Sequence, residues 1–192
     1  TSVNFTARAT QLTTTFGRDE LDRGIRYFGQ LLELMPREVR PEGLPRPMAL
    51  IHASRIGRAL YLVQAARSSS DIGIKVAFMC MAFEAMFSTD SVAVSQRVAE
   101  RAVLLLRPGG GESKTLFKRM KRLYKFRSVV VHGDQISTKR EAQVREVAST
   151  ADDDLRRTMI RILESQELLA LFSKNDRNAR NEHFTEQPSP KE

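Results

Sequence analysis

The chain has 192 residues, of which 41% are hydrophobic and 28% are charged, as expected for a soluble globular protein with one well-packed domain. Its single cysteine excludes a disulfide framework within the chain, and no Cys or His spacing indicates a metal site. The apolar run at 76–87 is too short to span a bilayer, and no signal peptide is visible, so we expect a cytoplasmic protein with no membrane segment.

The first third of the chain reads as an arm followed by two helices. Residues 1–16 are rich in Thr and have no clear period, so they form an extended arm, a strand left from an upstream domain, or disorder. The absence of an initiator Met is compatible with an excised piece of a longer protein. The spacing predicts an amphipathic helix over 17–35, a proline-rich connection, and a second helix over about 48–67.

The rest of the chain predicts three or four more helices and a polar tail. Residues 72–87 are apolar nearly all round, which places this helix at the centre of a bundle. Further helices are predicted over 91–107, 113–133 and 138–172, the last with a possible interruption at 149–154. We therefore expect an all-α domain, a bundle of five to six helices over 17–172, and a disordered polar tail at 173–192.

The helix predicted at 113–133 organises the sequence. Its apolar stripe contains Leu116, Met120, Leu123 and Val130, and Arg127 occupies the step between the last two. Seven Lys or Arg residues lie between 113 and 132, with no acid among them; without them the chain has 24 basic and 23 acidic residues, so they carry nearly all of the net charge of +8. Such a run is either a solvated face or a surface for a polyanion, and the absence of acids favours the second for Lys118, Arg119, Lys121, Arg122 and Lys125.

Four residues in the middle of the chain need polar partners or a chemical role: Glu84, Arg127, Ser128 and His132. Glu84 lies in the apolar helix, and a buried carboxylate without a partner is costly, so we expect it to pair with Arg127 across the helix contact. His132 falls in the last turn before Gly133, where it either gains from the helix dipole or serves as a general acid or base.

Arg127 and His132 also have the spacing of a known motif, an Arg followed by four residues and a His. All three histidines have an Arg at an allowed distance, because Arg46 precedes His52 and Arg177 precedes His183. Arg46 precedes a proline at a helix start and Arg177 lies in the polar tail, so only Arg127 and His132 lie together in the C-terminal half of a core helix. His52 lies on the apolar side of its own helix, as a core histidine would.

The runs AFEAMF, RVAERAVLLL and LYKFRSVVVHG, at 82–87, 97–106 and 123–133, resemble the Apea-like branch of the HEPN superfamily of helical domains. The resemblance covers about 72–172 and implies a HEPN-like bundle that pairs its motif helices in a homodimer. It also implies a possible metal-independent endoribonuclease with no cofactor, in which the 2′-hydroxyl of single-stranded RNA attacks the adjacent phosphate. Arg127 and His132 would be catalytic, and Ser128, Glu84 and Tyr124 would support them.

This resemblance suggests a bacterial defence or toxin ribonuclease, and two alternatives remain. One is a non-catalytic HEPN-like module that dimerises, binds RNA or senses a ligand for an upstream domain or partner. The other, membrane association through the basic helix, is weaker because the other face of that helix is needed for the core. Ser128 also departs from the Asn, His or Asp that follows the Arg in many nuclease members.

Overall fold

The computed structural model describes residues 7, 15–34, 54–89, 91–106, 111–132 and 138–186, and in these residues every regular element is a helix. The predicted all-α class is confirmed, although the described residues contain eight helices rather than five or six. They are α1 (Arg18–Leu34), α2 (Arg55–Ser68), α3 (Ile72–Phe87), α4 (Val94–Leu106), α5 (Gly111–Val131), α6 (Thr138–Leu163), α7 (Gln166–Ser173) and α8 (Arg177–Thr185).

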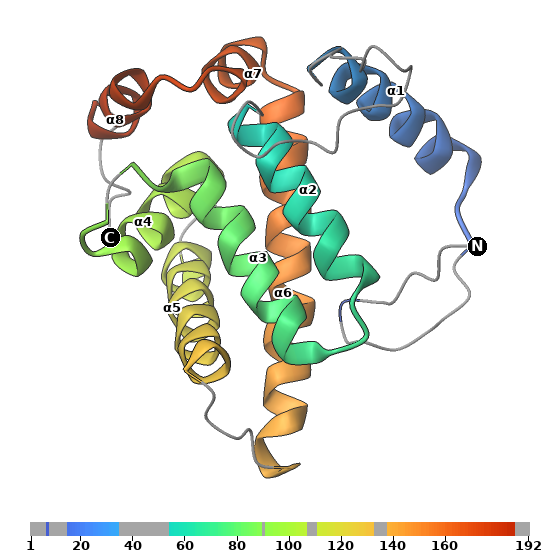
Figure 1. Ribbon diagram of the computed structural model, residues 1–192. Helices are drawn as coiled ribbons and strands as arrows, with labels where there is room; N and C mark the ends of the chain where they lie inside the picture. The colour runs from blue at the N-terminus through green and yellow to red at the C-terminus, as the bar shows by residue number, and fades with distance from the viewer. Residues whose placement is uncertain are drawn as a thin grey trace, which may run out of the picture.

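Helix α3 lies at the centre of the bundle, as its apolar sequence predicts. It packs against α2, α4, α5 and α6, and the long α6 runs along the height of the molecule (Figure 1). Val76, Cys80, Phe83 and Met86 of α3 are completely buried. A helix with no polar face has to be covered on most sides, and the four neighbouring helices provide that cover.

The turn between α2 and α3 is held by side chains from the start of α3. Asp71 is the N-cap, and its carboxylate accepts a hydrogen bond from the Ile74 amide at 2.8 Å. Lys75 is fully buried, and its Nζ donates to the carbonyl of Ala66 at 2.7 Å, near the end of α2. The ammonium group thus adds a second hydrogen bond to a carbonyl in the last turn of α2, which also accepts from the Ser69 amide at 3.4 Å. Burial lowers the pKa of Lys75.

Two helices begin later than the sequence predicts. The start of α2 is at Arg55, after the N-cap Ser54, and residues 48–53 of the predicted helix lie outside the described residues. Residues 91–93 bend before α4, and Ala93 has a φ of 51°, in the left-handed region. Glycine or asparagine usually occupies this conformation, so an alanine at this position gives no sequence signal that the helix starts only at Val94.

Helix α6 runs without a break through residues 149–154, where the sequence allows an interruption. Its buried positions Val144, Ala148, Ala151 and Leu155 continue with helical spacing across this stretch. The break comes later, at Glu164 and Ser165, and Ser165 caps α7 by accepting from the Leu168 amide. Thr150 and Asp153 bond within α6, while Asp152 and Asp154 pair with arginines of α2 and α5, so this stretch does not start a new helix.

The prediction of a disordered tail was wrong for residues 177–185, which form α8. Asp176 caps this helix by accepting hydrogen bonds from the amides of Asn178 and Ala179, each at 3.0 Å. Phe184 is 6% exposed and meets Phe87 and Phe172 edge to face, with ring centroids 5.9 and 6.5 Å away. Phe184 and the fully buried Arg180 dock the helix, and two buried positions in a polar segment are too few for helical periodicity to reveal. Residues 187–192 of the predicted tail lie outside the described residues.

Helix α1 lies beside the bundle (Figure 1), and most of its described side chains are exposed. Tyr27 packs against the core, and its hydroxyl donates to the Glu164 carboxylate at 2.7 Å. Three residues of the predicted apolar side, Leu21, Ile25 and Phe28, are 51%, 69% and 58% exposed. The helix is confirmed, but these three residues do not face the core. Of the predicted N-terminal arm, only residues 7, 15 and 16 are described.

We predict that Phe184→Ala destabilises the protein by about 3 kcal/mol, because it removes a buried aromatic ring and leaves a cavity beside Phe87 and Phe172. The exposed Phe28 provides a matched control, and Phe28→Ala should change the free energy of unfolding by less than about 0.5 kcal/mol. Urea denaturation followed by circular dichroism measures both. Equal midpoints for the two variants would show that α8 is not docked on the core.

Candidate functional site

The C-terminal end of α5 packs closely against the start of α3. Leu116, Met120 and Leu123 of α5 are each 1% exposed, and Val130 continues toward Gly73 of α3. A Cβ atom at Gly73 would lie 3.2 Å from a Val130 methyl group, so the glycine allows this close approach. The contact positions Arg127, one turn earlier, beside the C-terminal half of α3.

Arg127 and Glu84 form the predicted ion pair between α5 and α3. The distance between Arg127 Nη2 and Glu84 Oε1 is 3.8 Å, and the side chains are 36% and 25% exposed. The pairing is confirmed, but the contact is longer than a hydrogen bond and is not bidentate. A pair this open to water contributes little to stability, so the arginine is available for other contacts.

Tyr124 and Cys80 lie behind this pair, on the core side. The Tyr124 hydroxyl is buried and has no hydrogen-bond partner, and the same is true of Arg127 Nε. Burial raises the pKa of Tyr124, and the neighbouring Glu84 charge raises it further. Burial raises the pKa of the Cys80 thiol as well, so this cysteine is an inert core residue, as its apolar surroundings predict.

Ser128 and His132 lie on the outer side of Arg127, and both are exposed. Helix α5 ends at Val131, and the His132 amide donates to the Ser128 carbonyl at 3.0 Å in the final turn. Gly133, the predicted helix stop, lies outside the described residues. We refer to Glu84, Tyr124, Arg127, Ser128 and His132 as the Arg127 site: a guanidinium at the edge of the core with an imidazole in the next turn.

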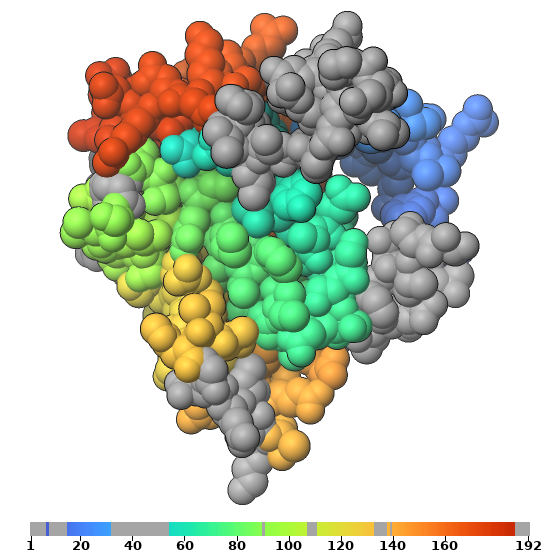
Figure 2. Space-filling model, in the orientation of Figure 1, coloured from blue at the N-terminus to red at the C-terminus, as the bar shows by residue number. Residues whose placement is uncertain are grey.

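Three large apolar residues near this site are exposed. Ile74 and Met81 of α3 are 45% and 40% exposed, and Val131 of α5 is 57% exposed. Ile74 and Met81 are seven residues apart, and therefore lie on one side of α3. Figure 2 shows α3 and α2 in the middle of the visible face, with the C-terminal part of α5 beside them. The side chains next to the Arg127 site are thus partly apolar and open to a partner.

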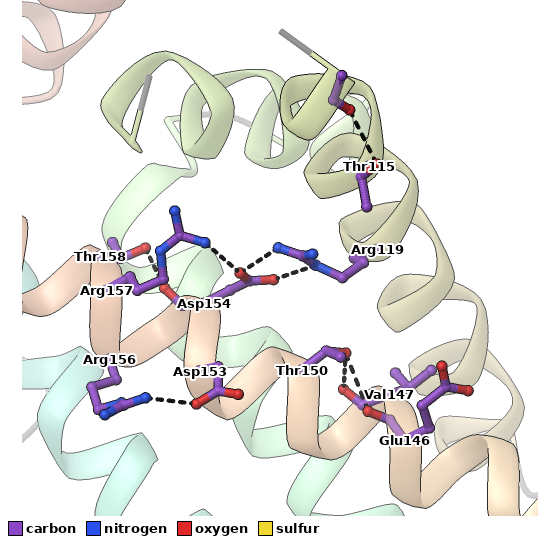
Figure 3. A network of polar contacts seen from close by, with 11 residues as sticks. Thr115, Arg119, Glu146, Val147, Thr150, Asp153, Asp154, Arg156, Arg157 and Thr158 are labelled. Atoms are coloured by element: carbon purple, nitrogen blue, oxygen red, sulfur yellow. Dashed lines mark hydrogen bonds and ion pairs between the residues drawn. The ribbon is translucent and has the colours of Figure 1, made fainter. Parts of the chain in front are cut away.

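The most tightly paired arginine of the basic helix is Arg119. Its Nε and Nη2 donate to the two carboxylate oxygens of Asp154 on α6, at 3.0 and 2.8 Å (Figure 3). Asp154 is 2% exposed, and Arg157 Nη1 lies 3.9 Å from it. Burial raises the pKa of Asp154, while Arg119 and Arg157 act in the opposite direction. Arg119 therefore holds α5 against α6.

The other basic residues of α5 divide between internal contacts and solvent. Arg122 Nη2 lies 3.2 Å from Glu146 Oε2 of α6, and Lys121 Nζ donates to Ser95 Oγ at 3.0 Å. Lys118 and Lys125 are exposed and have no ion pair within the described part of the chain. Of the five predicted RNA-binding residues, these two are the ones free to meet a phosphate backbone.

The other two Arg and His pairs differ from the Arg127 site. Arg46 and His52 lie outside the described residues. Arg177 and His183 belong to α8, so they lie in a helix and not in the irregular tail that the sequence predicts. His183 is 17% exposed, and its Nδ1 lies 3.9 Å from Glu167 Oε1, while its ring meets Phe184 edge to face. Its surroundings are those of a residue that packs α8 onto α7.

The structure also reveals charged residues that the sequence did not single out. Arg101 and Arg180 are 9% and 0% exposed, and Arg55 has a buried Nε without a hydrogen-bond partner. They come from α4, α8 and α2. With 23 arginines in the chain and α8 unrecognised, no sequence pattern could bring these three together.

The described residues contain no group of three or more His, Cys, Asp or Glu side chains arranged to hold a metal ion. None of their helices is long and apolar enough to cross a membrane.

Comparison of the chain with protein-family models, with curated proteins and with solved structures finds no match.

We predict that the two ion pairs of α5 differ in their contribution to stability. Arg119→Met should lower the free energy of unfolding by about 3 kcal/mol, because it leaves the Asp154 carboxylate buried without its bidentate partner. Arg127→Met should lower it by less than about 1 kcal/mol, because that pair is partly exposed. Urea denaturation at neutral pH tests both.

The double variant Arg119→Met, Asp154→Leu should recover most of the loss, since it removes the uncompensated charge. Equal losses from Arg119→Met and Arg127→Met would contradict this division between a structural and an available arginine.

Proposed function

We propose that the protein is a metal-independent endoribonuclease of HEPN type, which cleaves single-stranded RNA as a homodimer in a bacterial defence or toxin context. One observation carries the proposal. The Arg127 guanidinium lies at the edge of the core beside the Glu84 carboxylate, and an exposed His132 directly follows the last residue of the same helix. This arrangement offers a guanidinium and an imidazole to a ligand in the solvent.

The chemistry needs no more than these groups and the substrate. The 2′-oxygen of RNA attacks the adjacent phosphorus, the bond to the 5′-oxygen breaks, and a 2′,3′-cyclic phosphate and a 5′-hydroxyl form. His132 moves the proton, either from the 2′-hydroxyl or to the leaving 5′-oxygen. Arg127 stabilises the negative charge that develops on the phosphoryl oxygens. Glu84 positions the guanidinium from behind, and Ser128 and Tyr124 complete its surroundings.

A second copy of the chain would complete the site. Arg127 and His132 are five residues apart, so they leave an ideal helix about 140° from one another. One substrate phosphate meets both groups more easily if each comes from a different protomer. The exposed Ile74, Met81 and Val131 beside the site offer apolar area for such a contact.

The competing proposal is a HEPN-like module that binds RNA or a partner without cutting. A specific observation favours it: Arg119 and Arg122 form ion pairs with Asp154 and Glu146 inside the chain, which reduces the charge available to attract RNA. The exposed apolar side of α1 would also suit contact with another protein or domain.

We predict that the purified protein cuts single-stranded RNA in the presence of EDTA and leaves 2′,3′-cyclic phosphate ends. His132→Ala and Arg127→Ala should each reduce the rate by about 10²-fold or more, because each removes a group from the transition state. His183→Ala provides the matched control, since it removes a histidine of α8 and should leave the rate unchanged. Gel analysis of a labelled RNA measures the rate.

Circular dichroism should show that the variants remain folded, and light scattering should show that they remain dimers. RNA left intact by a folded, dimeric wild-type protein would contradict the nuclease and favour the module. Cleavage by His132→Ala at the wild-type rate would contradict the assigned site.

A separate prediction concerns RNA binding by the exposed lysines of α5. Replacing Lys118 and Lys125 together by Ala should weaken RNA binding at low salt, and the slope of log K against log salt should become shallower by about 1.4, because two phosphate contacts to a single strand are lost. Arg119→Met, which removes a cation already paired with Asp154, should change this slope much less. Fluorescence anisotropy across a salt series measures the slopes, and an unchanged slope in the double lysine variant would exclude these residues from the interface.

A further inference from the structure

Helix α1 presents a stripe of apolar side chains to the solvent. Leu21, Ile25 and Phe28, here called the α1 stripe, are 51%, 69% and 58% exposed. Their spacing of four and then three residues is that of the a and d positions of a coiled coil, and on a helix it places them within an arc of about 60°. A contiguous exposed stripe, unlike a single exposed apolar residue, marks a surface that another molecule covers.

The α1 stripe is not the side by which this helix meets the bundle. The Tyr27 hydroxyl donates to the Glu164 carboxylate at 2.7 Å, and Gln30 Nε2 donates to the Leu163 carbonyl at 3.5 Å. Leu31 packs against the core. At about 100° per residue, Tyr27, Gln30 and Leu31 lie about 130° around the helix from the stripe. A partner can therefore cover the stripe while α1 stays docked beside the end of α6.

Two glycines flank the stripe and leave room for a second helix. Gly24 and Gly29 lie about 70° to either side of it. A Cβ atom added to either glycine would meet nothing within 4 Å among the described residues. Glycine destabilises a helix relative to alanine, and neither glycine meets a packing need within the described part of the chain. Without side chains at these two positions, the backbone of another helix can approach the stripe closely.

The charges of α1 are divided along its length. Residues 18–22 contain three acids and one arginine, a net charge of −2, whereas residues 23–28 contain two arginines and no acid, a net charge of +2. Two parallel copies of α1 would place like charges side by side. Two antiparallel copies would place the acidic start of each helix beside the basic middle of the other, and would also set their helix dipoles in opposite directions.

The positions of two charged residues support the antiparallel arrangement. Asp22 and Arg26 lie on the side of the stripe that carries Gly29, both are exposed, and neither forms an ion pair within the described residues. In an antiparallel pair related by a twofold axis, this side of one helix meets the same side of the other. Asp22 of each copy then faces Arg26 of the other copy. In a parallel pair, Asp22 would instead face the side of the other helix that carries Glu20.

We propose that α1 binds α1 of a second copy of the chain in an antiparallel pair, held by the two apolar stripes and by two pairs of Asp22 with Arg26. This contact does not depend on the Arg127 site, and it uses a different surface from the dimer of the proposed function. If both contacts form, the chain assembles beyond the dimer, because each protomer then has two self-complementary surfaces.

The contact is small and therefore reversible. Helix α1 has 17 residues and is about 26 Å long, so two copies bury less than the roughly 1,200 Å² at which standard interfaces begin. We expect a dissociation constant of about 10 to 100 μM. The stripe is thus uncovered in the dilute protein that denaturation experiments use.

Sedimentation equilibrium over a series of protein concentrations tests the proposal. The mass of the wild type should rise about twofold as the concentration passes through this range. Ile25→Lys should raise the dissociation constant at least about tenfold, because it places a charge in the centre of the stripe. Ile25 is exposed, so the variant should fold, with the circular dichroism spectrum and the denaturation midpoint of the dilute wild type.

Ile74→Lys is the matched control. It places the same charge on an apolar residue of α3 that is 45% exposed, and it should leave the α1 contact intact. Because Ile74 lies beside the Arg127 site, this variant weakens the dimer of the proposed function if that dimer forms. Loss of association in Ile25→Lys alone supports the α1 contact. Loss in Ile74→Lys alone overturns it and leaves the dimer of the proposed function in place.

Charge exchange tests the orientation of the two helices. Asp22→Lys and Arg26→Glu should each weaken self-association about tenfold, since each variant places like charges opposite one another twice in the contact. An equimolar mixture of the two variants should associate as strongly as the wild type, because each altered residue then faces an opposite charge. A mixture that associates no more strongly than either variant alone would exclude the antiparallel pair.

A wild-type mass that is independent of concentration, or an Ile25→Lys variant that associates like the wild type, would overturn the proposal. A lower denaturation midpoint in Ile25→Lys, with no change in mass, would show that another segment of the same chain covers the stripe, and would overturn it as well.

Discussion

The packing of the helical bundle depends on the burial of α3 by its neighbouring helices. This helix has apolar side chains around most of its circumference, so it is stable in water only when α2, α4, α5 and α6 surround it. The two charged residues of α3, Lys75 and Glu84, lie where its burial by the neighbouring helices ends. Lys75 lies where α2 ends and uses its charge to satisfy backbone carbonyls, while Glu84 lies where the cover opens toward α5 and meets Arg127. The candidate site is thus located where the burial of the central helix is incomplete.

The arginines of the core lie in three kinds of environment. Arg119 meets a buried carboxylate with good geometry, and Arg127 meets a half-exposed one at a longer distance. Arg180 meets only a backbone carbonyl. Burial raises the pKa of Asp154 in the folded state. The free energy of unfolding therefore falls somewhat as the pH rises from the unfolded-state pKa of this carboxyl to its folded-state pKa. The bidentate bond to Arg119 offsets part of this loss and fixes α5 on α6.

Much of the fold could be predicted from apolar periodicity. The bounds of α3 match the prediction, and α5 and the start of α6 differ from it by two residues or fewer, because long apolar stripes determine them. The pairing of Glu84 with Arg127 also followed from the cost of burying either charge alone. Apolar periodicity could not predict that α8 packs on the core, because one buried phenylalanine in a polar segment does not form a periodic pattern. The exposure of Leu21, Ile25 and Phe28 could not be foreseen either, because an amphipathic helix reveals its apolar side but not what covers it.

The aromatic cluster of Phe87, Phe172 and Phe184 has a consequence for how the chain folds during synthesis. Its first and last members are 97 positions apart in the sequence. At about 5 to 20 residues per second, the ribosome delivers Phe184 roughly 5 to 20 s after Phe87. The C-terminal end of α3 therefore remains partly exposed until Phe184 has been synthesised. Closing so long a loop is slow, and in the meantime the exposed apolar end is a natural binding target for chaperones.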